Sequence, residues 1–325
     1  MVKQRIRSFF SYGGAIIRLV RLPNLLIVIL TQFLVRYSLI GPFLFRGQPE
    51  AMSGLTDFIF LVLATIMIAA GGYLINDYFD MDIDRVNNSG LNNIGGKITT
   101  REVLMIYRII NGIGILGGFY LAYRIRSLTF GLIFPFITGL LWFYSLRYKR
   151  MFLLGNIVVS FLSAMVILVV WIFEFFHLRL DPMGFSQLYI NLRVVNLLCG
   201  WFAVFAFLVS VAREIVKDME DREGDRLYGR HTLPLVSGIR TAKLVVMMII
   251  AVTLFLLGYG MIVLYRLNFR MTIYYVLIAI VIPFFYLLYK LFRSKEKEDY
   301  QGLSTLLKLI MLSGIFSMQV LSINY

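Results

Sequence analysis

The sequence predicts an all-α, polytopic membrane protein with nine transmembrane helices. Of its 325 residues, 59% are apolar and only 15% are charged, and the mean hydropathy is +0.80. These values lie far outside the range of soluble globular proteins. In addition, apolar stretches close to the roughly 20 residues that a helix needs to cross a bilayer recur along the whole chain.

In chain order, these stretches predict nine spans joined by short connections. No long polar segment separates them, so we expect one integral-membrane domain over residues 1–325. The basic N-terminus is not followed by a short apolar core with a small-residue cleavage site, so we expect no cleaved signal peptide. The predicted spans are residues 22–45, 58–78, 103–123, 128–146, 152–175, 194–215, 245–264, 271–291 and 303–322.

Lysine and arginine predict the orientation of these spans. With the N-terminus inside, the loops near residues 79–102, 147–151, 216–244 and 292–302 face the cytoplasm, and together with the N-terminal arm they hold most of the 32 basic residues. This is the positive-inside pattern. We expect a protein of the cell (inner) membrane with its active site facing the cytoplasm. Arg36 falls within the first span, where its charge can snorkel to the interface. The net charge of +14 is spread over short loops, which favours contact with membrane lipid over nucleic acid.

A first acidic cluster ends the second span. At about 100° per residue, Asn76, Asp77, Asp80 and Asp84 fall within roughly 100° of one another on a helix, whereas Asp82 points to a different side. Carboxylates are costly beside a bilayer, so a stripe of them at the end of an apolar run predicts a site. Positive-inside topology places this site at the cytoplasmic surface.

A second acidic cluster ends the sixth span. On a continuous helix, Asp218, Asp221 and Asp225 would lie within about 60° of one another. Converging carboxylates repel each other unless a cation lies between them. Hard oxygen donors with one amide suit Mg²⁺, which retains waters and substrate phosphate oxygens among its ligands. The two clusters therefore predict a Mg²⁺ site for a phosphorylated ligand.

At these residues the chain resembles a known family. The pattern Asn-Asp-x-x-Asp-x-x-x-Asp at residues 76–84, followed by Asp-x-x-x-Asp-x-x-x-Gly at residues 221–229, is similar to the paired motifs of the UbiA superfamily of intramembrane prenyltransferases. The resemblance covers the whole chain and implies a UbiA-type helix bundle with a central cavity. Within the family, residues 213–234 resemble the branch that makes digeranylgeranylglyceryl phosphate. Homogentisate and chlorophyll prenyltransferases share parts of this pattern.

The resemblance implies Mg²⁺-dependent transfer of a prenyl group from an allylic prenyl diphosphate to a lipophilic acceptor. Mg²⁺ would neutralise the charge that builds on the leaving diphosphate. The metal ligands implied are Asn76, Asp80, Asp84, Asp221 and Asp225. The candidates for contact with the diphosphate are Arg21, Lys97, Arg147, Lys149 and Arg213, and those for orienting or catalytic roles are Asp77, Asp218 and Tyr144.

The acceptor has two candidates. Residues 213–234 favour geranylgeranylglyceryl phosphate. However, many family members carry an Arg-Pro-x-x-Ser-Gly stretch after the first cluster, and here residues 91–97 lack it and hold Lys97 as their only cation. An aromatic acceptor of quinone, tocopherol-like or chlorophyll-like biosynthesis therefore stays open. More remote alternatives are a CDP-alcohol phosphotransferase, whose Asp-Gly-x-x-Ala-Arg motif is absent, and a cation transporter, whose acids would lie near the midplane.

Overall fold

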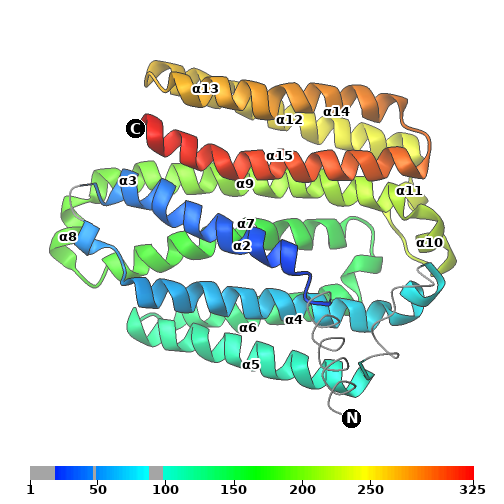
Figure 1. The fold of residues 1–325 in the computed structure, drawn as a ribbon, viewed down its shortest axis with the longest axis horizontal. Helices are drawn as coiled ribbons and strands as arrows, with labels where there is room; N and C mark the ends of the chain where they lie inside the picture. Colours follow the sequence, from blue (N-terminus) through cyan, green and yellow to red (C-terminus); the bar gives the residue numbers. More distant parts are fainter. Residues whose placement is uncertain (1–18, 47–48, 88–97) are drawn as a thin grey trace, which may run out of the picture. The chain divides into compact units, whose positions relative to one another are not determined.

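The computed structural model describes residues 19–46, 49–87 and 98–325, with side chains described through residue 81 and again from residue 98. Within these residues the elements are helices, and nine of the helical segments are long and apolar enough to cross a membrane (Figure 1). Each predicted span overlaps one of the nine, so the all-α, nine-span prediction is confirmed.

In chain order the elements are α2 (Leu22–Leu34), η1 (Val35–Ile40), α3 (Gly41–Leu44), η2 (Pro49–Ala51), α4 (Leu55–Asn87), α5 (Thr100–Arg124), α6 (Leu128–Leu146), η3 (Tyr148–Arg150), α7 (Leu154–Leu178), α8 (Pro182–Gln187), α9 (Tyr189–Glu220), α10 (Arg222–Leu227), α11 (Leu233–Val236), α12 (Gly238–Arg266), α13 (Arg270–Val276), η4 (Leu277–Val281), α14 (Ile282–Arg293) and α15 (Lys297–Asn324).

Two of the helices that continue beyond the C-terminal ends of their predicted spans carry acidic residues there. The second span was expected to end at residue 78, but α4 is helical to Asn87. The sixth was expected to end at residue 215, but α9 is helical to Glu220. The apolar run marks only the part of a helix that contacts lipid, so hydropathy alone underestimates a helix that continues into the polar interface.

The chain divides into two compact units. The first comprises Met1–Leu30 and Ser53–Tyr148, and the second comprises Thr31–Met52 and Lys149–Tyr325. The first acidic cluster belongs to the first unit and the second cluster to the second unit. Each unit is described by itself below, and the expectation of one domain over the whole chain stays a prediction.

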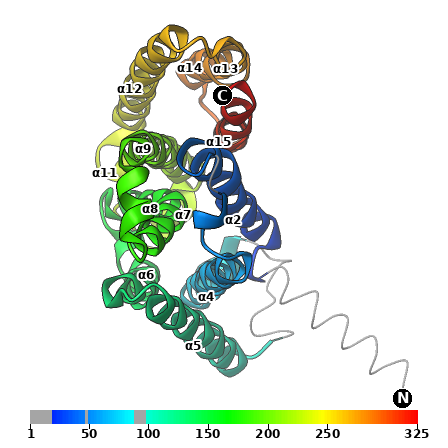
Figure 2. The same cartoon turned by 90° about the vertical axis from the view of Figure 1, so that its left-hand side faces the viewer.

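In the first unit, α4, α5 and α6 pack against one another (Figure 2). Close packing of α5 against α6 depends on glycine, because a Cβ added at Gly118 would lie 2.3 Å from the ring of Phe134. Lipid gives helices no hydrophobic reason to associate, so membrane helices rely on such small residues to bring their surfaces together. At the start of α4 and the end of α5, Asp57 and Arg124 form an ion pair with a distance of 3.0 Å between Oδ2 and Nη2.

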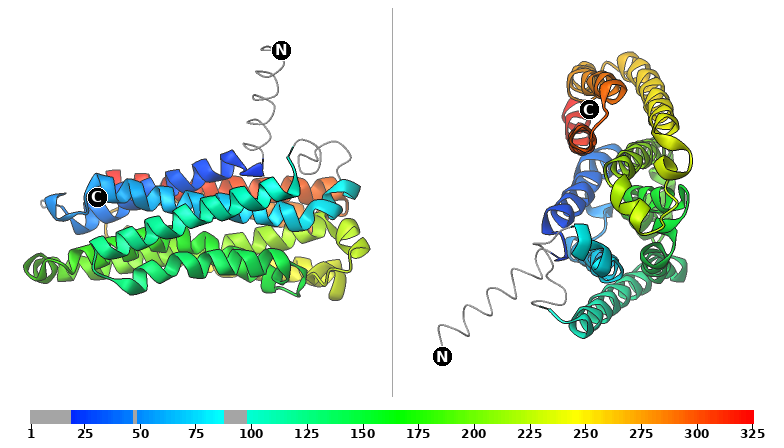
Figure 3. Two further views of the ribbon diagram at one scale, coloured as in Figure 1. Left: turned by 90° about the horizontal axis from the view of Figure 1, so that it is seen from below. Right: turned by 90° about the vertical axis from the view of Figure 1, so that its right-hand side faces the viewer.

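In the second unit, α9 packs against α7, α12 and α15. The chain then folds back through α13 and α14, and α12, α14 and α15, coloured yellow to red, lie together in the right-hand view of Figure 3. Apolar side chains fill the space between these helices and exclude lipid from it. Members of this core that are fully or almost fully buried are Ile215, Val216, Ala242, Val246, Leu287, Leu291 and Leu307.

The second unit contains two π-helical segments, each just before a proline. The segment η1 precedes Pro42, and η4 precedes Pro283. Proline lacks an N–H group, and its ring clashes with the carbonyl four residues earlier in a regular α-helix. A local widening of the helix accommodates this clash and keeps the backbone hydrogen-bonded within the membrane. The segment η1 also carries Arg36 into the interior of the unit.

Candidate active site

The first acidic cluster lies on one continuous helix. Because α4 has no break before Asn87, Asn76, Asp80 and Asp84 recur every four residues along one face, as the sequence predicts. The side chains of Asn76 and Asp80 are half-buried. The side chain of Asp84 lies outside the described residues, so its role as a ligand stays a prediction.

Arg21 and Asp77 form an ion pair in the first unit. Nη2 of Arg21 donates to Oδ1 of Asp77 over 2.8 Å, and the guanidinium carbon lies 5.2 Å from the ring centroid of Tyr73, one turn earlier on α4. Burial would lower the pKa of Arg21, but the charge of Asp77 and the hydrogen bond to it outweigh this effect, so the pKa is raised. The phenol of Tyr144 adds a smaller favourable interaction. Three residues that the sequence nominated for the site thus interact.

The backbone at Arg21 is itself unusual. Its φ of +53° places it in the left-handed region just before α2, which costs a residue with a Cβ about 1–3 kcal/mol. The carbonyl of Arg21 accepts a hydrogen bond from the N–H of Asn24 over 2.8 Å and closes the first turn of the helix. The ion pair with Asp77 and the stacking on Tyr73 offset this strain and hold the guanidinium beside the acidic cluster.

Aromatic rings from three helices meet in the first unit. Trp142 on α6 makes ring contacts with Phe79 on α4 and Tyr107 on α5, each with a centroid distance of 5.6 Å. Rings of this kind attract cations through their faces. The sequence analysis proposed only Tyr144 as an aromatic site residue. Contacts between rings on three different helices cannot be recognised from the spacing of residues along the chain.

The second acidic cluster is interrupted. The helix α9 ends at Glu220, Asp221 is its C-terminal cap with φ −88° and ψ 6°, and α10 starts at Arg222. The expectation that three aspartates share one face of a continuous helix was therefore wrong. Asp221 is exposed, whereas the side chain of Asp225 is 4% exposed. The break gives each aspartate of this cluster a different environment.

Asp225 pairs with an arginine that the sequence did not single out. Nη1 of Arg230 lies 2.8 Å from Oδ1 of Asp225. Gly229 has a φ of +62°, which a glycine adopts without strain, and it turns the chain back so that the N–H of Arg230 also donates to the carbonyl of Asp225 over 3.0 Å. This geometry gives a structural reason for the glycine four residues after Asp225.

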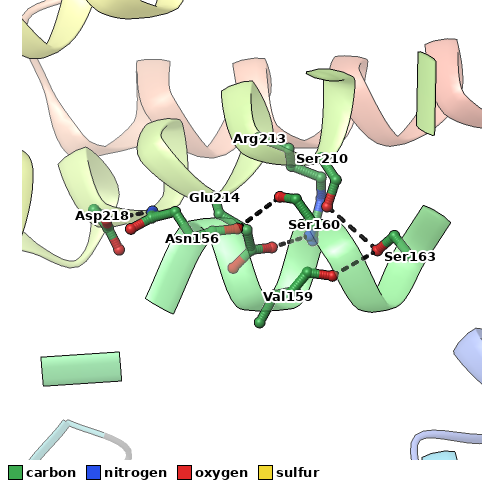
Figure 4. A network of polar contacts seen from close by, with 8 residues as sticks. All are labelled: Asn156, Val159, Ser160, Ser163, Ser210, Arg213, Glu214 and Asp218. Carbon is green, nitrogen blue, oxygen red and sulfur yellow. Dashed lines mark hydrogen bonds and ion pairs between the residues drawn. The ribbon is translucent and has the colours of Figure 1, made fainter. Parts of the chain in front are cut away.

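Asp218 is held by a residue from another helix. Nδ2 of Asn156, in the first turn of α7, donates to Oδ2 of Asp218 on α9 over 2.7 Å (Figure 4). Asn156 is 7% exposed. On the same side of α9, Nη1 of Arg213 lies 2.7 Å from Oε1 of Glu214. Sequence reasoning missed Asn156, for which the only signal was an amide at the start of an apolar span.

The remaining basic candidates are distributed between the two units. Arg147 is exposed at the C-terminal end of α6, in the first unit. Lys149 lies in η3, in the second unit, and is buried. Lys97 lies outside the described residues. Contact of these three residues with a diphosphate stays a prediction.

The oxygen donors fit Mg²⁺ held with few protein ligands. In the described part of the chain, no group of three or more His, Cys, Asp or Glu side chains is close enough to hold a metal ion. Mg²⁺ does not need such a cage, because it is commonly bound by one or two carboxylates, waters and substrate phosphates. Asn76 and Asp80 on one face of α4 offer such a set, and Asp221 offers an exposed carboxylate. The assignment of individual ligands stays a prediction.

Comparisons with known proteins match most of the chain to one family. The model of the UbiA prenyltransferase family matches residues 38–309. A digeranylgeranylglyceryl phosphate synthase from Methanothermobacter thermautotrophicus is 35% identical over 192 residues, which cover 58% of this chain and 59% of that protein. The match therefore spans about three fifths of the length of this relative.

Two solved structures share the fold. A structure of digeranylgeranylglyceryl phosphate synthase in membranes has a TM-score of 0.67 at 22% identity, covering 97% of this chain and 100% of that one. A UbiA homologue from Archaeoglobus fulgidus, bound to DMAPP and Mg²⁺, has a TM-score of 0.53 at 17% identity, covering 94% and 99%. The family match extends over most of the sequence and includes both acidic clusters. The chain belongs to the UbiA prenyltransferase family.

Proposed function

We propose that the protein transfers a prenyl group from an allylic prenyl diphosphate to a hydroxyl oxygen of a glycerol-linked lipid phosphate, in a reaction that requires Mg²⁺. The observation that carries this proposal is the pair of acidic clusters at the ends of two membrane-length helices in a chain of the UbiA family. The relative from Methanothermobacter thermautotrophicus supports the acceptor class through its name.

Mg²⁺ would be held by Asn76, Asp80, Asp84, Asp221 and Asp225, and when bound it would neutralise charge on the leaving diphosphate. The homologue bound to DMAPP and Mg²⁺ supports this role. The protein's own cations would assist. We propose that Arg21 remains on Asp77 and presents its other N–H groups to the diphosphate, because a guanidinium has five donors in a fixed fork. Lys97, Arg147, Lys149 and Arg213 remain further candidates for the same contact.

The prenyl chain is hydrocarbon and would lie among apolar side chains within the membrane. When the bond between C1 and the diphosphate oxygen breaks, positive charge develops on the allylic carbons. Trp142, Tyr107 and Tyr144 would stabilise this charge through their ring faces. Water would also stabilise the cation, but it would compete with the acceptor by reacting with it. The acceptor oxygen then forms the bond to C1 and loses its proton.

We place the reaction at the cytoplasmic surface of the cell membrane. The first cluster follows the second span and the second cluster follows the sixth, so the chain crosses the membrane four times between them, in spans three to six. An even number of intervening spans puts both clusters on the same side of the membrane, and the distribution of lysine and arginine favours the cytoplasmic side. This common side supports the proposal that both clusters act on one diphosphate.

The metal part of the proposal is tested by three alanine variants. Asp80→Ala and Asp221→Ala should each lower turnover by about 100-fold or more, because each removes a ligand that neutralises the leaving group. Asp82→Ala is the matched control, since residue 82 lies on a different side of α4, and it should retain most of the activity. Turnover would be measured as diphosphate release over a range of Mg²⁺ concentrations. Equal losses for all three variants would contradict the assignment.

The acceptor part is tested with the purified protein and a panel of acceptors. We expect an ether product with geranylgeranylglyceryl phosphate, identified by mass. The panel includes 4-hydroxybenzoate, homogentisate and dihydroxynaphthoate, because the lack of an Arg-Pro stretch at residues 91–97 leaves an aromatic acceptor open. Prenylation of one of these rings, without the ether product, would overturn the acceptor and leave prenyl transfer in place.

A further inference from the structure

The two acidic clusters have the same internal spacing, although they differ in their surroundings. In each cluster, three aspartates are separated by three and then four residues, at positions 77, 80 and 84 and at positions 218, 221 and 225. The leading aspartate of each set, Asp77 or Asp218, is held by a side chain from a different part of its own unit. Arg21 holds Asp77 over 2.8 Å, and Asn156 holds Asp218 over 2.7 Å.

The two anchors differ in charge. Arg21 brings a positive charge to the carboxylate of Asp77, whereas the amide of Asn156 is neutral and brings no charge to Asp218. Within the described residues Asp218 forms no ion pair, and Arg213, one to two turns earlier on α9, is paired with Glu214 over 2.7 Å (Figure 4). Of two carboxylates at corresponding positions, one is therefore compensated by a cation and the other is not.

The geometry also fixes the direction of the uncompensated carboxylate. The amide of Asn156 engages Oδ2 of Asp218 and leaves the lone pairs of Oδ1 available as acceptors. Because Asn156 is 7% exposed and lies in the first turn of α7, packing restricts its rotamers. A carboxylate held in one orientation by this hydrogen bond, one turn before Asp221, is suited to accept a proton.

We propose that Asp218 accepts the proton of the acceptor hydroxyl and that Asn156 is the residue that positions it. This inference rests on the proposed function. In the reaction the hydroxyl oxygen forms a bond to C1 of the prenyl group, and the bond from C1 to the diphosphate oxygen breaks with its electron pair leaving on the diphosphate. The hydroxyl proton passes to Oδ1 of Asp218. We assign this step to Asp218 rather than to Asp77, because Oδ1 of Asp77 already accepts a hydrogen bond from Arg21.

The test separates loss of the diphosphate from its transfer to the acceptor. The full-length protein is incubated with Mg²⁺, geranylgeranyl diphosphate and geranylgeranylglyceryl phosphate, and three quantities are measured: diphosphate released, ether product and geranylgeraniol formed by water. For Asp218→Asn, we expect the yield of ether per diphosphate released to fall by about 100-fold or more. Release of diphosphate should remain close to that of the wild type, with the prenyl group recovered as geranylgeraniol.

The positioning role of Asn156 has its own variant. Asn156→Leu keeps a similar volume but removes the amide, so the ether yield should fall by about 10-fold, a typical effect of losing a supporting hydrogen bond. Ser163→Ala is the matched control, since Ser163 contacts Ser210 on α9 at 3.3 Å but not Asp218, and its ether yield should equal that of the wild type.

Binding provides a readout that is independent of turnover. Mg²⁺ with a non-hydrolysable prenyl diphosphate analogue should raise the thermal midpoint of Asp218→Asn as it does for the wild type, and should fail to do so for Asp221→Asn. If Asp218→Asn loses diphosphate release or this thermal shift, Asp218 serves the metal and the inference is overturned. An unchanged ether yield in Asn156→Leu would overturn its positioning role. Failure of the proposed function is distinct, because the wild type itself would then form no ether product.

Discussion

Arg36 and Glu174 show what a single charged residue requires inside a membrane. Their side chains are 1% and 0% exposed, and Nε of Arg36 lies 3.6 Å from Oε1 of Glu174. The expectation that Arg36 snorkels to the interface was wrong, because η1 directs it into the second unit rather than along the surface of the helix. Charges buried in this way are costly unless they are paired. The sequence could not reveal the pair, since its members are far apart in the chain.

Removing one member of this pair should destabilise the protein strongly. Arg36→Met leaves the carboxylate of Glu174 buried without its arginine, and we expect a loss of about 3–5 kcal/mol in the free energy of unfolding. The double variant Arg36→Met/Glu174→Leu leaves neither charge and should recover most of this loss. Arg108→Met on α5 is the control, because Arg108 is exposed. Unfolding would be followed by fluorescence in detergent, and a loss for Arg36→Met no larger than for Arg108→Met would count against the prediction.

At the scale of the element, helices could be predicted where hydropathy or a continuous stripe defines them. The helical course of the first acidic cluster was predicted correctly, because α4 is unbroken through its polar end. The second cluster was not, because Asp221 and Arg222 carry no signal of a helix end such as glycine or proline. The break coincides instead with contacts made later in the chain, above all the turn at Gly229 that returns Arg230 to Asp225.

The packing of α5 against α6 gives a prediction at the same scale. Gly118→Ala would place a Cβ 2.3 Å from the rigid ring of Phe134, so the two helices must separate or the ring must move, at a cost of about 1–3 kcal/mol. Gly112→Ala on the same helix meets no atom within 4 Å and should be neutral or slightly stabilising, since alanine favours helix. The thermal midpoints of the two variants in detergent measure the difference, and equal midpoints would refute the prediction.

At the scale of the whole molecule, the sequence predicted the class, the number of spans and the acidic clusters because each depends on composition or short-range spacing. It did not predict the partners Asn156 and Arg230. Asn156 reaches Asp218 across 62 residues, and no local pattern records such a contact. The residues that orient the carboxylates therefore had to come from the structure, whereas the carboxylates themselves could be read from the chain.

The orientation of the chain is the prediction that belongs to this scale. An unbroken count of spans places Arg226, after the sixth span, on the cytoplasmic side, and Met183, between the fifth and sixth, on the opposite side. Both positions are exposed, and the native Cys199 is 0% exposed, so it should not react with a polar reagent. In intact cells a membrane-impermeant maleimide should label Met183→Cys but not Arg226→Cys, and in inverted vesicles the pattern should reverse. If both cysteines were labelled from the same side, the number of spans assigned between them would be wrong by an odd number. The argument that places the second acidic cluster at the cytoplasmic surface would then fail.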